Sequence, residues 1–195
     1  MAASISLDQF GHTLSKPNEK RVLDDNQVHR AISRISHEIL EKNGGAVAIV
    51  LIGIHTRGAM LAHRLYETVQ ALDEDRKISV GTLDVGLYRD DFSRGARPRV
   101  RPTIIPVPLD NRLTVLIDDV LYTGRTVRAA MNALIDFGRP QQIQLGVLVD
   151  RGHRELPIKA DYVGKNMPTS RDEEVRVRIK EKDGLDEVVI VNNGK

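Results

Sequence analysis

Two adjacent carboxylates followed by a helix start form the most distinctive chemical group in this sequence. The stretch VLIDDVLYTGRT (115–126) places Asp118 and Asp119 after an apolar run and just before Thr123-Gly124-Arg125-Thr126. Two neighbouring like charges cost stability unless something binds them. A helix beginning near Gly124 offers unpaired N–H groups and the positive end of its dipole, which suit a phosphate. The acids suit hydroxyls or a hydrated cation, so the stretch predicts a site for a ribose 5-phosphate.

Other phosphate and acid motifs do not match this spacing. The chain has no G-x-x-x-x-G-K-[ST] and no G-x-G-x-x-G after an expected strand. A phospho-aspartate loop would need a second acid two positions after Asp118, where Val120 stands. An ordinary capped strand-to-helix turn is the remaining alternative, but a cap needs only one acid.

The elements that must position these residues alternate between apolar runs and amphipathic helices. The expected helices are a first one capped by Asp24 or Asp25 and running to about Asn43, a second around 61–72 and a third around 124–137. The expected strands are 46–53, 78–88, 113–117 and 143–149, and the alternating tail 174–191 predicts a C-terminal β-hairpin turning at Asp183-Gly184. Strands alternating with helices predict an α/β fold, with a doubly wound, mainly parallel sheet flanked by helices.

Ligands of such sheets bind at the carboxyl ends of the strands. Three short loops are expected there, at 53–58, 118–126 and 150–157, and each contains both Arg and Gly. We therefore expect the functional site where these three loops meet.

Bulk composition restricts the possible functions. The chain has 195 residues, which fits a single domain at 24–195 after a flexible polar arm at 1–23. The net charge is only +2, so nucleic-acid binding would need local clusters of basic residues. The absence of cysteine excludes disulfides and thiolate catalysis and fits a cytoplasmic protein. The sequence has neither a long apolar run nor a signal-peptide pattern, so no membrane association is expected. The six His are scattered, which argues against a zinc site.

Several motifs together resemble a known family. VLIDDVLYTGRT resembles the phosphoribosyl pyrophosphate (PRPP) loop of type I phosphoribosyltransferases. GIHTRG, LYRDD, FGRP and VDRGHRELPIKADYVGKNMPTS resemble the pyr operon regulatory proteins, the PyrR family, which are uracil phosphoribosyltransferases that also bind messenger RNA. The resemblance covers about residues 24–190, and the long block at 149–170 is more specific than the phosphate loop. It implies the type I phosphoribosyltransferase fold, with a mobile hood loop and a C-terminal hairpin.

The resemblance also implies roles for individual residues. Asp118 and Asp119 would hold the ribose hydroxyls, and Leu121 to Thr126 would grip the 5-phosphate. Thr56 and Arg57 would contact the leaving diphosphate in a loop with a non-proline cis peptide expected at Thr56–Arg57. Catalysis would rest on Asp118, Asp119 and Arg57, with Mg²⁺ bound through PRPP near the two acids. The whole implied substrate-binding set is Thr56, Arg57, Gly58, Asp118, Asp119, Val120, Leu121, Tyr122, Thr123, Gly124, Arg125, Thr126, Asp150, Arg151 and Val175.

Two further regions gain roles through the resemblance. The Arg- and Pro-rich stretch 89–106, with Arg89, Arg94 and Arg97, would be the hood that closes on diphosphate and excludes water. An RNA-binding surface maps onto two groups that would otherwise be taken for solvated surface. These residues are Ser33, Arg34, His37, Lys42, His153, Arg154, Lys159 and Lys165.

The implied activity converts uracil and PRPP into UMP and diphosphate, in a protein that binds the pyr mRNA leader in response to UMP or UTP. An alternative is an RNA-binding attenuator that keeps the site as a UMP sensor with little or no turnover. A third possibility is another base, hypoxanthine or guanine, against which only the resemblance of the 149–170 block argues. The resemblance implies a homodimer or a tetramer.

Overall fold

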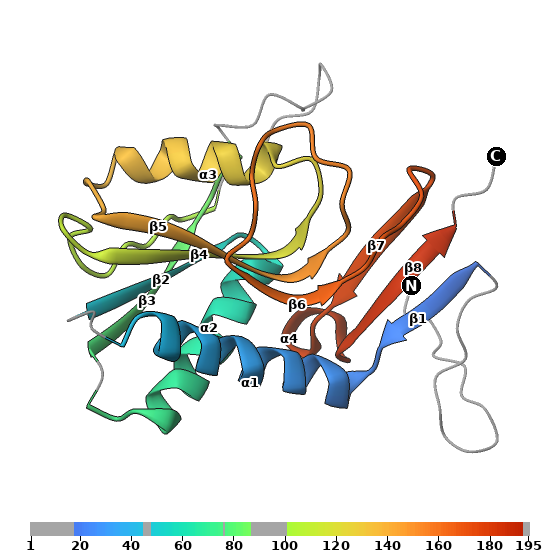
Figure 1. Ribbon diagram of the computed structural model, residues 1–195, viewed down its shortest axis with the longest axis horizontal. Helices are drawn as coiled ribbons and strands as arrows, with labels where there is room; N and C mark the ends of the chain where they lie inside the picture. The colour runs from blue at the N-terminus through green and yellow to red at the C-terminus, as the bar shows by residue number, and fades with distance from the viewer. Residues whose placement is uncertain (1–17, 45–47, 76, 87–100, 193–195) are drawn as a thin grey trace.

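The centre of the molecule is a five-stranded parallel sheet. The computed structural model describes residues 18–44, 48–75, 77–86 and 101–192. The strands lie in the order β3-β2-β4-β5-β6, and every neighbouring pair is parallel (Figure 1). Their bounds are Ala48–Ile54 (β2), Lys77–Leu83 (β3), Leu113–Leu121 (β4), Gln142–Asp150 (β5) and Tyr162–Asn166 (β6). The predicted doubly wound parallel sheet is confirmed, with β6 as a strand that was not predicted.

Helices cover both faces of this sheet. α1 (Asp25–Lys42) and α2 (Arg57–Leu72) lie on one face, and α3 (Arg125–Ile135) lies on the other (Figure 1). The apolar core is divided in the same way, because Ile49 and Leu51 of β2 pack with α1 and α2 while Val50 and Ile52 pack with α3. Strands buried on both faces need continuous apolar runs, which is why β2 and β4 were recognisable in the sequence.

The first helix begins where the sequence predicted. Asp24 and Gln27 form a capping box, in which the Asp24 side chain accepts the Gln27 N–H and the Gln27 side chain accepts the Asp24 N–H. At its other end, Asn43 joins a buried polar network with Gln144 and Tyr162. The Asn43 amide donates to the Tyr162 hydroxyl oxygen at 2.8 Å, and that hydroxyl donates to Gln144 Oε1 at 2.6 Å. This network ties the end of α1 to β5 and β6.

A second, antiparallel sheet has the order β1-β8-β7. It consists of β1 (Glu19–Leu23), β7 (Glu173–Arg178) and β8 (Glu187–Asn192), so the predicted C-terminal hairpin is present. The short helix α4 (Lys180–Asp183) lies between β7 and β8, and Gly184 follows it with a φ of 82°. Residues 19–23, expected from the sequence to belong to the N-terminal arm, form β1 by pairing with β8, a partner too distant in the chain to be evident from local pattern.

Within the described residues, no helix has both the length and the apolar character needed to cross a lipid bilayer.

Candidate active site

The two adjacent acids lie at the carboxyl end of β4. This strand continues to Leu121 and does not end at Ile117 as predicted, so both acids belong to it. The Asp118 side chain is buried, and its Oδ1 accepts the Asp119 N–H at 3.0 Å. Asp119 Oδ1 accepts the Val120 N–H at 3.0 Å in the same way. These local bonds hold the two carboxylates at the head of the next loop.

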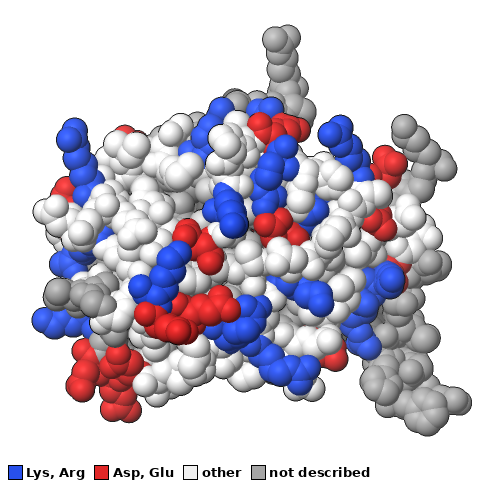
Figure 2. Space-filling view, in the orientation of Figure 1, with Lys and Arg blue, Asp and Glu red and all other residues white. Residues whose placement is uncertain are grey.

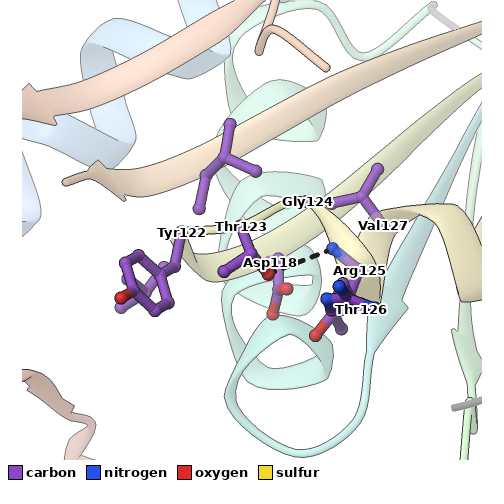
Figure 3. A pocket seen from close by; sticks show the side chains of 9 residues that line it. Asp118, Tyr122, Thr123, Gly124, Arg125, Thr126 and Val127 are labelled. Atoms are coloured by element: carbon purple, nitrogen blue, oxygen red, sulfur yellow. Dashed lines mark hydrogen bonds between the residues drawn. The ribbon is translucent and has the colours of Figure 1, made fainter. Parts of the chain in front are cut away.

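The loop after β4 ends in the start of α3. Gly124 precedes the helix with a φ of 92°, a conformation that favours glycine. A cavity of about 210 Å³ opens here, lined by Asp118 and by Val120 to Val127. Figure 3 shows the Asp118 carboxylate beside the start of α3 and the Tyr122 ring extending away from it. The cavity therefore combines a carboxylate with a helix N-terminus, as the sequence suggested.

The loop after β2 is short and leads directly into α2. The His55–Thr56 peptide bond is cis, one residue before the predicted Thr56–Arg57, because Arg57 already belongs to the first turn of the helix. The Arg101 side chain donates to the Thr56 hydroxyl. The His55 ring lies 3.1 Å from the Pro102 carbonyl oxygen, so the segment at 101–102 packs against this loop.

Gly58 brings the two loops together. A Cβ atom at Gly58 would lie 2.4 Å from the Ile117 carbonyl oxygen and 3.1 Å from Asp118 Cα. The start of α2 therefore packs directly against the backbone that carries Asp118. This contact falls between β2 and β4, where the strand order reverses: β3 lies outside β2, and β5 and β6 lie outside β4. Doubly wound sheets bind their ligands at this switch point.

The third predicted loop, after β5, braces the second. The Glu155 and Leu156 N–H groups both donate to the Thr123 carbonyl, at 3.0 and 3.2 Å. Arg154 donates to the Leu121, Tyr122, Gly152 and Ile158 carbonyls and to the Asp150 carboxylate. The Arg154 guanidinium therefore holds the two loops together.

A second cavity of about 330 Å³ lies beside this loop. It is lined by Asp150 to His153 and by Asn166 to Thr169. Arg151 is buried, donates to Thr169 Oγ1 at 3.1 Å and places its guanidinium carbon 4.2 Å from the centre of the Tyr122 ring. Since Tyr122 also lines the first cavity, this stack connects the two cavities. Val175, predicted to line the base site, is buried in the core on β7 and lines neither of them.

The residues predicted for RNA binding lie in two regions, one formed by α1 and β6 and the other by the loop after β5. Those of α1 lie beside β6: Arg34 donates to the Val163 and Gly164 carbonyls at 2.9 and 2.6 Å, and Lys42 pairs with Asp161 at 2.6 Å. Lys165 and Lys159 are exposed. His153 lies at the site itself, with Nε2 near the Thr169 carbonyl oxygen. In Figure 2, Lys and Arg side chains are interspersed with Asp and Glu and do not form one continuous basic patch.

Some predicted residues are outside the structural description, and one contact was missed. Arg89, Arg94 and Arg97 of the expected hood lie outside the described residues. Asp183, expected from the sequence to be a turn residue, binds Arg57 through two hydrogen bonds. The two positions are 126 residues apart, so no local signal in the sequence indicates their contact.

Comparisons with known proteins agree with this architecture. The profile of the phosphoribosyl transferase domain family matches residues 18–181. The chain is 55% identical over 175 residues to the bifunctional protein PyrR of Chloroflexus aurantiacus, covering 89% of this chain and 96% of that protein. It is 56% identical over 172 residues to the bifunctional protein PyrR of Bacillus cereus, covering 87% and 95%.

Solved structures share the fold at lower identity. A hypoxanthine phosphoribosyltransferase of Staphylococcus aureus superposes with a TM-score of 0.66 at 22% identity, covering 89% of this chain and 93% of that one. The Trypanosoma cruzi hypoxanthine phosphoribosyltransferase gives 0.66 at 17% identity, covering 89% and 96%. The predicted type I phosphoribosyltransferase fold is thus confirmed. The chain belongs to the phosphoribosyl transferase domain family and, within it, to the bifunctional PyrR proteins.

Proposed function

We propose that this protein transfers the phosphoribosyl group of PRPP to uracil, and that it regulates pyr genes by binding their mRNA with UMP as co-effector. The proposed enzymatic activity is supported mainly by one observation, the contact between two loops at the switch point of the sheet. One loop brings Asp118, Asp119 and the start of α3, and the other brings Thr56 and Arg57. PRPP carries a phosphate, two hydroxyls and a diphosphate, and this pair of loops offers a partner for each.

PRPP fits the two loops in one orientation. Its 5-phosphate lies against the N–H groups at the start of α3 and the hydroxyls of Thr123 and Thr126, where the helix dipole favours an anion. The ribose hydroxyls lie on Asp118 and Asp119, since carboxylates accept hydrogen bonds from vicinal hydroxyls. The diphosphate then lies toward Thr56 and Arg57, across the Gly58 contact.

The reaction needs positioning and charge neutralisation more than a protein nucleophile. Uracil N1 forms a bond to ribose C1 as the bond from C1 to the diphosphate oxygen breaks, and the N1 proton passes to the leaving diphosphate or to water, giving UMP and diphosphate. Positive charge grows on the ribose ring and negative charge on the leaving group. The two acids hold the ribose and lie near its developing positive charge, while Arg57 neutralises the diphosphate. The absence of cysteine is compatible with this mechanism.

Mg²⁺ is the cofactor that the family implies, and the carboxylate oxygens of the site suit this cation. Carboxylate oxygens are the protein ligands that Mg²⁺ prefers, and Asp118 and Asp119 supply them beside the ribose position. Among the described residues, no cluster of three or more His, Asp or Glu could hold a metal by itself. A cation that takes most of its ligands from PRPP and water agrees with this donor set, and it would neutralise charge on the diphosphate.

Uracil is assigned to the second cavity, beside Asp150 and Arg151. The Arg151–Tyr122 stack lies between this cavity and the phosphate loop. Backbone and side-chain polar groups at 150–153 and 166–169 line the cavity, and such groups can distinguish a pyrimidine by its hydrogen bonds. The hypoxanthine enzymes share only the fold with this chain, so they do not favour a purine.

The regulatory half is assigned to the surface formed by α1 and the edge of β6. Ser33, Arg34, His37 and Lys42 of α1 lie beside this strand, with Lys165 on it and Lys159 before it. RNA loops offer phosphates to Lys and Arg and bases to His and Arg. Arg154 and His153 lie in the loop after β5 and would extend this surface toward the nucleotide site. UMP, and UTP as its further product, would act through the same ribose-phosphate site. We place the protein in the cytoplasm, where nucleotides and mRNA are present, and infer a homodimer or tetramer.

A direct assay separates catalysis from sensing. The protein is incubated with PRPP and Mg²⁺ and, in parallel, with uracil, hypoxanthine or guanine, and nucleotide formation is measured. We expect UMP from uracil and no purine nucleotide. If no nucleotide forms but UMP still tightens binding of the leader RNA, the protein is a UMP-sensing attenuator without turnover. If IMP or GMP forms in preference, the base assignment is wrong.

A further inference from the structure

The guanidinium of Arg57 faces an acid from a distant part of the chain. Arg57 is the first residue of α2, and Asp183 is the last residue of α4. Arg57 Nε donates to Asp183 Oδ2 at 3.1 Å, and Nη2 donates to Oδ1 at 3.0 Å. The Arg57 side chain is 28% exposed and that of Asp183 is 18% exposed, so solvent only partly screens the pair. This two-bond geometry fixes the plane of the guanidinium as well as its position.

The positive charge of Arg57 at the start of a helix must be offset by another group. The N-terminal end of a helix is the positive end of its dipole, so an Arg there is disfavoured. The first turn of α2 contains no acid that would offset it. Asp183 supplies the missing negative charge from outside the helix. An Arg kept at this position adds its charge to the dipole, and both then favour an anion in the same place.

Asp183 is itself held in place. The Ile179 N–H donates to Asp183 Oδ2 at 2.9 Å, so the carboxylate is anchored to the start of α4. Burial alone would raise the pKa of Asp183, but the hydrogen bonds from Arg57 and the Ile179 amide lower it below its ordinary value. The carboxylate is therefore charged at neutral pH and can act as a fixed acceptor.

Arg64 provides an internal comparison. It lies seven residues after Arg57, two turns along the same face of α2, and binds two acids of the same C-terminal segment. Its Nε and Nη2 donate to Glu181, at 2.8 and 2.6 Å, and its Nη1 and Nη2 donate to Asp186, at 2.6 and 2.9 Å. Four of the five N–H groups of a guanidinium are thus used at Arg64, but only two at Arg57. Within the described residues, the Nη1 edge of Arg57 contacts no acceptor, whereas both edges of Arg64 are occupied.

We propose that Asp183 is a positioning residue for phosphoribosyl transfer: it holds Arg57 by one edge so that the other edge is presented to the diphosphate of the donor. This inference rests on the proposed function, since it needs a diphosphate at the loop after β2. It assigns to the connection between β7 and β8 a part in catalysis exerted through Arg57, and it assigns to Arg64 a purely structural pairing.

The test compares two matched substitutions, Asp183→Asn and Asp186→Asn, in the full chain. Each removes one carboxylate charge that faces an Arg of α2. Binding of inorganic diphosphate is measured by calorimetry, and KM values for PRPP and uracil are measured with kcat. We expect Asp183→Asn to weaken diphosphate binding and raise the KM for PRPP by roughly tenfold, with the KM for uracil unchanged. Asp186→Asn should leave diphosphate affinity within about twofold of the wild type. This should hold even if Asp186→Asn lowers the melting temperature as much as Asp183→Asn does.

A double-mutant cycle tests whether Asp183→Asn weakens diphosphate binding through Arg57 or through a general effect on the structure. In an Arg57→Ala background, Asp183→Asn should cause no further loss of diphosphate affinity, because its effect passes through Arg57. Diphosphate binding by Asp183→Asn that equals or exceeds that of the wild type would overturn the inference and identify Asp183 as a competitor for Arg57. An equal loss in both backgrounds would also overturn it. If the wild type binds no diphosphate and makes no UMP, the proposed function fails together with this inference, whereas normal wild-type activity with an unaffected variant refutes the inference alone.

Discussion

At the residue scale, the closeness of the two site loops depends on Gly58 having no side chain. Its position at the start of α2 is in contact with the backbone of Ile117 and Asp118. Backbone cannot give way as a flexible side chain does, so any added atom must separate α2 from β4. The distance between the loop at Thr56-Arg57 and the acids Asp118 and Asp119 is therefore set here.

Gly58→Ala is expected to disturb both stability and activity. The new Cβ would lie 2.4 Å from the Ile117 carbonyl oxygen, which forces the backbone to shift. We expect a loss of about 2 kcal/mol in the free energy of unfolding, measured by denaturant titration, and a larger proportional loss of kcat/KM. Gly44→Ala is the control, because its Cβ would have no neighbour closer than 3.7 Å. Unchanged activity in Gly58→Ala would mean that the contact does not set the site geometry.

Asp119→Asn tests the role of the paired acids more directly. The side chain is partly exposed at the end of β4, so the substitution should leave the fold intact. Loss of the negative charge beside the ribose should lower kcat/KM by about a hundredfold with only a small change in melting temperature. Asp110→Asn, in the turn that precedes the other end of β4, is the control and should retain activity. A variant at Asp119 with wild-type kinetics would remove these acids from the mechanism.

At the element scale, α1 is fixed to the sheet by the network of Asn43, Gln144 and Tyr162. All three side chains are buried and hydrogen-bonded to one another. Burial raises the pKa of the Tyr162 hydroxyl to about 12, partly opposed by the hydrogen bond from Asn43. Since α1 carries much of the proposed RNA surface, this network also positions that surface.

Tyr162→Phe should lower the free energy of unfolding by roughly 1–2 kcal/mol, because Asn43 and Gln144 each lose a buried partner. The raised pKa adds a second expectation. Above pH 10 the unfolded chain loses the tyrosine proton while the folded chain keeps it, so wild-type stability falls as the pH approaches 12. The variant should show a shallower fall over this range in thermal melts. Tyr66→Phe on α2 is the control, and equal alkaline slopes in wild type and Tyr162→Phe would contradict the assignment.

The elements also show what could be predicted from the sequence. β2 and β4 are long apolar runs buried on both faces, and α1 has a clear cap and stripe, so local pattern was sufficient for them. β6 was missed because its five residues end in Gly164, Lys165 and Asn166, which lack a strand pattern. β1 and the Arg57–Asp183 pair depend on partners far away in the chain. The acids and helix start were recognisable because adjacent residues form them, whereas contacts between loops were not.

At the scale of the whole molecule, one fold would present two surfaces for related ligands. The carboxyl ends of the strands carry the proposed nucleotide site, and the edge formed by α1 and β6 carries the proposed RNA surface (Figure 1). The loop after β5 lies between them, since its residues contact the phosphate loop and lead into β6. This loop is therefore adjacent to both proposed surfaces.

Lys165→Ala is expected to weaken binding of the leader RNA and reduce its dependence on salt. A lysine that contacts one phosphate contributes close to one unit to the slope of log K against log salt concentration, so the slope should become shallower by about 0.7–1. Filter binding over a range of salt concentrations measures this. Lys77→Ala, an exposed lysine on the opposite edge strand β3, is the control. Identical slopes for the two variants would show that the RNA binds elsewhere.

The switch point between β2 and β4 is the proposed ribose-phosphate site. A crystal structure of the protein with UMP tests it most directly. We predict that the phosphate lies at the start of α3 against Thr123 to Thr126, with the ribose hydroxyls on Asp118 and Asp119 and the base beside Arg151. UMP bound elsewhere, or bound here with its phosphate away from α3, would show that the switch point is not the ribose-phosphate site.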